Sequence, residues 1–136
     1  SRCRVRVKEA EDKEPAAAGV VYFAPSDYHL LVERDGSLAL SSDELVNYSR
    51  PSIDVLFESA ADAYGAGLTG VILTGANTDG AAGLQAVATA GGETIVEDPR
   101  QAYASTMPEA ALAACPARVL DLDAIAHSLR PAAVSD

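Results

Sequence analysis

Polar and apolar residues alternate near the start of the chain. Arg4 to Lys8 follow a two-residue period, which is typical of a half-buried strand. A continuous β-prone run, residues 20–24, predicts a second strand that Pro25 ends. The polar, Ala- and Pro-rich stretch between them, residues 9–19, is expected to form a loop.

Two further apolar runs, residues 29–33 and 37–40, flank the sequence Arg34-Asp35-Gly36. An Asp-Gly pair between two apolar strands is a strong signal for a β-hairpin. We therefore expect the first part of the chain to be antiparallel.

The period becomes helical after Asn47. Pro51 fits the first turn of a helix, where its missing N–H costs nothing. One apolar face then follows at steps of three and four residues, formed by Ile53, Leu56, Phe57, Ala60, Ala61 and Tyr64. Gly65 suits the C-cap of this helix.

From Gly65 onward, predicted strands and helices alternate. Val71-Ile72-Leu73 is a short, fully apolar strand and is expected to be buried on both faces. The later elements are a helix over 80–90, a strand over 93–96, a helix over 108–114, a strand over 118–120 and a last helix that Asp123 caps and that runs to Leu129. This order predicts one α/β domain over residues 1–136. Its sheet is expected to be wound and mainly parallel, with helices on both faces and an added antiparallel hairpin.

Charge and composition exclude several classes of partner. The 136 residues carry a net charge of −10, and Lys8 and Lys13 are the only lysines. Nucleic acids and anionic membrane surfaces are bound by basic faces, so we expect neither as a partner. No apolar run approaches the roughly 18 residues that cross a bilayer, so no membrane insertion is expected.

The two cysteines, Cys3 and Cys115, stand far apart and lack the spacing of metal ligands. We therefore expect no metal and no cofactor. Two lone thiols suit a cytoplasmic protein, and a disulfide between them stays open as an alternative.

The stretch Gly65–Gly70 reads G-x-G-x-x-G but follows a predicted helix and leads into a strand. A dinucleotide-binding fingerprint has the opposite order, because the helix that follows it must meet the pyrophosphate. We therefore interpret these glycines as a cap and a loop.

The stretch Gly75–Gly80 follows a buried strand and opens a helix, at the carboxyl edge where α/β sheets place their sites. Gly75 permits a tight turn, and the backbone N–H of Ala76 is placed to point into a cleft. At Asp79, where the helix begins, the helix dipole favours an ionised carboxylate, which is the state that orients an imidazole. On spacing alone, the simpler interpretation is that Asp79 caps this helix while Asn77 shapes the turn.

The remaining candidates do not complete a catalytic group. His29 follows a predicted strand and is a candidate for lining the same cleft, whereas His127 falls on the last helix and is interpreted as structural. No G-x-S-x-G nucleophile elbow occurs in the chain. The residues alone therefore offer an acid and a backbone-rich loop, without a nucleophile or a base.

A series of short blocks carries a family resemblance: Val7–Asp12, Val21–Pro25 with Asp27 and His29, Ser49–Phe57, Gly70–Leu84, Gly91-Gly92, Asp98-Pro99, Met107-Pro108 and Val119-Leu120. In these blocks the chain resembles the catalytic domain of the chemotaxis-type protein-glutamate methylesterases (CheB-like). The blocks span nearly the whole chain and occur in that family's order.

The resemblance implies a wound α/β domain that hydrolyses methyl esters on receptor glutamates, and can deamidate receptor glutamines, through a Ser-His-Asp triad. It assigns the triad acid to Asp79 and an oxyanion-hole backbone N–H to Ala76, where many relatives carry Met. Gly75, Asn77, Thr78 and His29 are the expected cleft lining. Implied partners are the cytoplasmic region of a methylated chemoreceptor, or a similar methylated protein, and a response-regulator receiver domain.

The same resemblance places the family's serine and histidine before Ser1. We therefore expect the chain to be the carboxyl-terminal part of such a domain, inactive alone and with an unpaired sheet edge that promotes self-association. Two alternatives stay open. One is a non-catalytic relative that keeps the fold as a binding or regulatory module, and the other is an unrelated α/β domain that binds a ligand such as a nucleotide.

Overall fold

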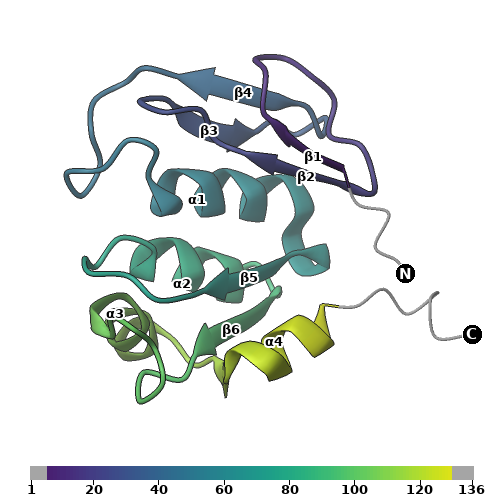
Figure 1. Cartoon of the computed structure of the whole chain (residues 1–136). Coiled ribbons are helices and arrows are strands. Elements are labelled where there is room, and N and C mark those ends of the chain that lie inside the picture. The colour runs from purple at the N-terminus through teal and green to yellow at the C-terminus, as the bar shows by residue number, and fades with distance from the viewer. Residues whose placement is uncertain (1–5, 130–136) are drawn as a thin grey trace, which may run out of the picture.

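The structure, a computed structural model, describes residues 6–129 (Figure 1). In the first part, β1 (Arg6–Glu9) pairs with β2 (Val20–Phe23), and β3 (His29–Val32) pairs with β4 (Leu38–Ser41). The β3–β4 pair is antiparallel, and the Asp35 carboxylate in its turn accepts hydrogen bonds from the N–H and the hydroxyl of Ser37. The predicted hairpin is confirmed.

The β1–β2 pair is parallel, so the expectation of a wholly antiparallel first part is wrong. The reason lies in the connection between the strands, residues 10–19, which does not turn back as a hairpin loop. It runs beside the β3–β4 hairpin, where the Lys13 N–H donates to the Leu38 carbonyl at 2.7 Å and the Leu38 N–H donates to the Glu14 carbonyl at 2.8 Å. This detour supplies the crossover that a parallel pair requires.

Helix α1 (Ile53–Tyr64) lies between the β3–β4 hairpin and helix α2 (Ala81–Thr89) and packs on both (Figure 1). Its N-cap is Ser52, which has an extended backbone, so Pro51 stands just before the helix and not in its first turn. Gly65 ends the helix as predicted, and its N–H donates to the Ala61 carbonyl. A 3₁₀ turn, Gly65–Gly67, then leads into the next strand, which confirms that these glycines follow a helix and precede a strand.

The remaining strands form one parallel sheet in the order β5 (Thr69–Ile72), β6 (Glu93–Glu97) and β7 (Arg118–Leu120). Helix α2 connects β5 to β6, α3 (Thr106–Ala114) connects β6 to β7, and α4 (Leu122–Ser128) packs against β6 and β7. The predicted α/β class, with a parallel sheet flanked by helices and an added antiparallel strand pair, is confirmed.

The starts of α3 and α4 also differ from the prediction. Helix α3 begins at Thr106, which places Pro108 inside its first turn, a position that tolerates proline. Asp121 and not Asp123 caps α4, because the Asp121 carboxylate accepts the N–H of Ala124 at 2.8 Å.

The main core lies between this sheet and the helices and contains Ile72, Leu84, Val96, Met107, Ala111 and Cys115. The predicted strand Val71–Leu73 is less enclosed than expected: Ile72 is buried, whereas Leu73, which follows the end of β5, is 44% exposed. Within residues 6–129, β5 has β6 as its one neighbour in the sheet, so its other edge is unpaired there. None of the helices in the described part of the chain combines the length and apolar character of a membrane span.

Candidate functional site

The connection from β5 to α2 combines an exposed loop with a buried carboxylate. Ala76, Asn77 and Thr78 are exposed, whereas the next residue, Asp79, is only 2% exposed. Figure 1 shows this connection on the same side of the molecule as the connections from β4 to α1 and from β6 to α3. The predicted site loop therefore lies at the carboxyl edge of the sheet.

Backbone contacts with the β6–α3 connection hold the start of this loop. The Gly75 N–H donates to the Ala104 carbonyl, and the Met107 N–H donates to the Gly75 carbonyl, each at 3.0 Å. A Cβ atom at Gly75 would lie 2.6 Å from the Met107 Cε, closer than side-chain atoms approach. Close packing against Met107 therefore accounts for the glycine here, where the sequence suggested a tight turn.

The Asp79 carboxylate caps α1, not the helix that follows Asp79 in the sequence. Its Oδ2 accepts the N–H of Ile53, and its Oδ1 accepts the Ser52 hydroxyl at 2.8 Å and the Asn47 side-chain amide at 2.9 Å. Ile53 and Ser52 stand at the amino terminus of α1, the positive end of its dipole, so the carboxylate complements that end of the helix. Helix α2 itself has Gly80 at its N-cap, with φ 103°.

Asp54, in the first turn of α1, does for α2 what Asp79 does for α1. Its Oδ1 accepts the N–H groups of Gly80 at 3.0 Å and Gly83 at 2.7 Å. Its Oδ2 accepts the same Asn47 amide nitrogen at 2.7 Å. The two helices therefore cap each other, and one asparagine joins the two buried carboxylates.

Sequence reasoning did not find Asn47, Ser52 or Asp54 as parts of this network. An aspartate in the first turn of a helix indicates interaction with the dipole of its own helix, and Asp54 had such a placement. Nothing local to Asn47 signals that its partners lie 7 and 32 positions away.

His29 is 2% exposed, and backbone groups engage both of its ring nitrogens. The ring Nε2 lies 2.8 Å from the Glu44 carbonyl, and Nδ1 lies 3.2 Å from the Ser52 N–H. A carbonyl accepts and an N–H donates, so this pattern fits the neutral imidazole protonated on Nε2. His29 thus supports the residue that bonds Asp79, and its ring does not stand open in a cleft. His127, by contrast, lies exposed on α4.

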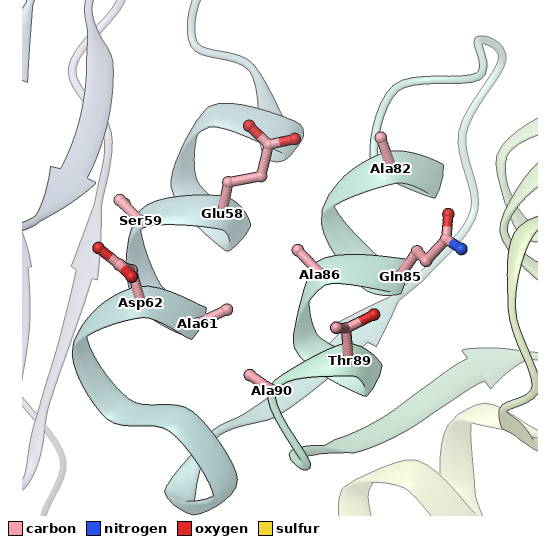
Figure 2. A pocket seen from close by; sticks show the side chains of 9 residues that line it. All are labelled: Glu58, Ser59, Ala61, Asp62, Ala82, Gln85, Ala86, Thr89 and Ala90. Atoms are coloured by element: carbon pink, nitrogen blue, oxygen red, sulfur yellow. The ribbon is translucent and has the colours of Figure 1, made fainter.

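Two surface hollows bear on where a ligand would sit. One, of about 700 Å³, is lined by Glu44, Leu45, Asn47, Tyr48 and Arg50 and so adjoins Asp79 through Asn47. The other, of about 540 Å³, is a groove between α1 and α2, where Figure 2 shows mostly short side chains with Glu58 and Asp62 at the rim. None of residues 75–79 lines either hollow, but a direct partner of Asp79, Asn47, lines the first, so we place the candidate site beside that hollow.

Within the part of the chain that the structure describes, no three His, Cys, Asp or Glu side chains converge as metal ligands would. Cys115 is a buried free thiol, and burial raises its pKa. Cys3 lies outside the described residues, so the structure does not test the alternative of a disulfide between the two cysteines.

Comparison with known proteins identifies the family. The sequence model of the CheB methylesterase family matches residues 1–129. A protein of Leptospira interrogans, named for protein-glutamate methylesterase and protein-glutamine glutaminase activity, is 50% identical over 126 residues, which cover 92% of this chain and 65% of that protein. A Chromohalobacter salexigens protein-glutamate methylesterase/protein-glutamine glutaminase is 43% identical over 135 residues, covering 97% of this chain and 37% of that protein.

The fold gives the same answer. The crystal structure of the Thermotoga maritima CheB methylesterase catalytic domain superposes with a TM-score of 0.83 at 34% identity. The match covers 89% of this chain and 66% of that one, so the chain spans about two thirds of the catalytic domain it resembles. The chain belongs to the CheB methylesterase family.

Proposed function

We propose that this chain is the carboxyl-terminal part of one hydrolase domain that removes methyl groups from protein glutamates and deamidates protein glutamines, with Asp79 as its triad acid. The relatives are named for these two activities, and one of them matches 92% of the chain at 50% identity. The chain spans 65% of that relative, so the complete reaction belongs to a longer protein. In this proposal, residues 1–136 form a single partial domain.

The observation that carries the proposal is that the Asp79 carboxylate is buried and held in one orientation by hydrogen bonds. Asp79 is 2% exposed, and its orientation is fixed by two close donors at the α1 terminus, from Ser52 and Ile53, and by the Asn47 amide. A carboxylate offers about four acceptor positions. Oδ2 holds one close donor in the described residues, from Ile53, which leaves it capacity to accept the N–H of an imidazole.

The proposed mechanism draws the other two triad members from a segment that precedes Ser1. The serine Oγ attacks the ester carbonyl carbon while the histidine takes the hydroxyl proton, and Asp79 fixes the ring tautomer and stabilises its positive charge. The tetrahedral intermediate collapses, and the methoxy group leaves as methanol with the proton from the histidine. Water then hydrolyses the acyl-enzyme to the free glutamate, and with a glutamine substrate ammonia leaves instead.

The exposed turn beside Asp79 has the features of an oxyanion site in this scheme. The Ala76 backbone N–H would donate to the oxygen that becomes negative, a role that does not depend on the side chain. Gly75, Asn77 and Thr78 would form the adjoining wall of the cleft. The substrate would be a methylated chemoreceptor cytoplasmic region or a similar protein, met in the cytoplasm, and a receiver domain would be the regulator.

The test compares two aspartate variants of the full-length protein. Asp79→Asn is expected to lower kcat for methyl-ester hydrolysis by roughly 10⁴-fold, as in protease triads, because asparagine orients the imidazole in the wrong tautomer. Asp121→Asn changes the same atoms at another helix cap, on α4, and is expected to keep kcat within about twofold because surface caps act mainly on stability. Release of methanol from a methylated receptor fragment measures both. Turnover near the wild-type value in Asp79→Asn would reduce Asp79 to a helix cap.

A further inference from the structure

Within residues 6–129, Asn47 is the side chain that bonds both buried carboxylates of the site, those of Asp54 and Asp79. Its side-chain nitrogen lies 2.9 Å from the Asp79 Oδ1 and 2.7 Å from the Asp54 Oδ2. A primary amide carries two hydrogens on that nitrogen, one for each carboxylate. The pair of contacts therefore uses the whole donor capacity of the asparagine.

A neutral double donor is what this arrangement requires. Since one nitrogen contacts both carboxylates, their bonded oxygens lie within about 6 Å of each other, a distance at which two carboxylate charges repel each other. Asp54 is 7% and Asp79 2% exposed, so water screens this repulsion weakly. Asn47 supplies a hydrogen bond to each charge without adding a charge of its own.

The bond from Asn47 also selects which oxygen of Asp79 is left for a further partner. Oδ1 accepts the Asn47 amide, the Ser52 hydroxyl and, at 3.4 Å, the Asp54 N–H, whereas Oδ2 accepts the Ile53 N–H. Two side-chain donors on one oxygen and a backbone donor on the other resist rotation of the carboxylate plane. Loss of Asn47 removes one of the two side-chain donors.

The loop that carries Asn47 is itself held in place. Val46 and Ser49 exchange backbone hydrogen bonds at 3.0 and 2.9 Å across the turn, and Asn47 has φ 54°, a left-handed conformation that asparagine tolerates well. Arg50 ties the loop down, because its guanidinium donates to Asp27 and to the carbonyls of Ser42 and Asp43. The amide therefore reaches the carboxylates from an anchored turn.

We infer that Asn47 is a positioning residue of the esterase: it acts through Asp79, by fixing the carboxylate so that Oδ2 faces the catalytic imidazole. This inference rests on the proposed function.

The test is a double-mutant cycle on kcat in the full-length protein. Asn47→Ala is expected to lower kcat for methyl-ester hydrolysis by roughly 10- to 100-fold, the size of one hydrogen bond to a charged group, with KM nearly unchanged. In an Asp79→Asn background, Asn47→Ala is expected to have no further effect on kcat, because a positioning residue has nothing left to position. A purely structural role would lower activity by the same factor in both backgrounds.

Ser59→Ala is the matched control for lost stability. Like the Asn47 side chain, the Ser59 side chain makes two hydrogen bonds, but away from Asp79: its hydroxyl, on α1, accepts the Val32 N–H of β3 at 2.9 Å and donates to the Leu56 carbonyl. It is expected to lower Tm without changing kcat. Asn47→Asp keeps the shape but places a third carboxylate in the cluster, and is expected to lower kcat further than Asn47→Ala.

The outcomes separate this inference from the proposed function. If Asp79→Asn keeps its turnover, the triad assignment fails and the inference fails with it. If Asp79→Asn loses turnover while Asn47→Ala keeps kcat within twofold of wild type, or if the two losses multiply in the double variant, the inference alone is overturned.

Discussion

The amino termini of α1 and α2 are built alike but differ in what surrounds them. Each is capped by an aspartate from the other side of the helix pair, and Asn47 bonds both aspartates. Asp54 lies in the first turn of α1, and its carboxylate accepts hydrogen bonds from two N–H groups at the start of α2 and from Asn47. Asp79 ends an exposed loop, beside Ala76 to Thr78. Burial and hydrogen bonding are thus common to both carboxylates, and the exposed loop beside Asp79 is the feature that distinguishes it as the proposed triad acid.

The largest expected difference between Asp79 and Asp54 is in the effect of their substitution on turnover. In the full-length protein, Asp79→Asn is expected to lower kcat by roughly 10⁴-fold, whereas Asp54→Asn is expected to lower it less than about tenfold. Asp54→Asn keeps one acceptor oxygen, so its NH₂ group faces either the N–H groups of Gly80 and Gly83 or the NH₂ group of Asn47, and its main effect is a loss of about 1–3 kcal/mol of stability. Methanol release and chemical denaturation measure the two quantities. Equal losses of kcat would abolish the distinction between the two carboxylates.

Two glycines test how closely α1 and α2 must approach for mutual capping. A Cβ atom at Gly83 would lie 2.7 Å from the Phe57 Cβ and 3.0 Å from the Asp54 Cα, and neither atom can swing aside. Gly83→Ala is therefore expected to cost about 1–3 kcal/mol. Gly75→Ala meets the Cε and Sδ of Met107, which can move, and the Met107 Cβ at 3.0 Å, which cannot, and is expected to cost about 1 kcal/mol, less than Gly83→Ala. Urea unfolding of both variants measures the difference, and the reverse order would contradict the packing described for α1 and α2.

The stability that a single surface N-cap contributes is a reference for the two caps that join α1 and α2. Asp121 caps α4 alone, with one hydrogen bond to the Ala124 N–H. Asp121→Ala is expected to cost about 1 kcal/mol, a typical value for an exposed N-cap. Thermal unfolding compared with Asp54→Asn checks this. If Asp121→Ala lost as much stability as Asp54→Asn, a cap that joins two helices would contribute no more than a cap on one helix.

The smallest expected effect concerns Asp98, a carboxylate that caps neither helix of the pair and bonds Arg100 instead. Hydrogen bonds from the Arg100 side chain and backbone N–H lower the pKa of Asp98. A carboxyl group with a lowered pKa in the folded state stabilises the fold above its unfolded pKa, and this contribution is lost as the pH falls through the folded pKa. Arg100→Gln is therefore expected to lower Tm slightly at neutral pH, and the difference from wild type is expected to shrink in acid. The Arg100 side chain is 87% exposed, so salt should weaken the effect. A difference that grows in acid would contradict the assigned sign.

Periodicity was sufficient to predict most elements, because the signals lie within a few residues of each other. The hairpin around Asp35 and the helix after Asn47 are examples. The direction of the β1–β2 pair was mispredicted, because it depends on backbone bonds between Lys13, Glu14 and Leu38, more than 20 positions apart in the sequence. Nothing in the local composition of residues 10–19 encodes those bonds.

The site was predictable to the same degree. The position of Asp79 after a buried strand and before a helix indicated a carboxylate at a helix terminus. Which helix it caps was not predictable, since Ile53 and Ser52 lie 26 and 27 positions away. The interpretation of Asp79 as a cap and the proposal that it is the triad acid are compatible, because the same donors that cap α1 hold the carboxylate in place.

Mutual capping by Asp54 and Asp79 has a consequence for how this pair of helices can change over evolutionary time. A substitution at position 54 leaves N–H groups of α2 without their acceptor, and one at position 79 does the same to α1. A change at the start of either helix therefore destabilises the amino terminus of the other helix. Sequence drift at either terminus is expected to need compensation across the pair, and in an alignment of relatives the residues at 47, 54 and 79 are expected to vary together or not at all.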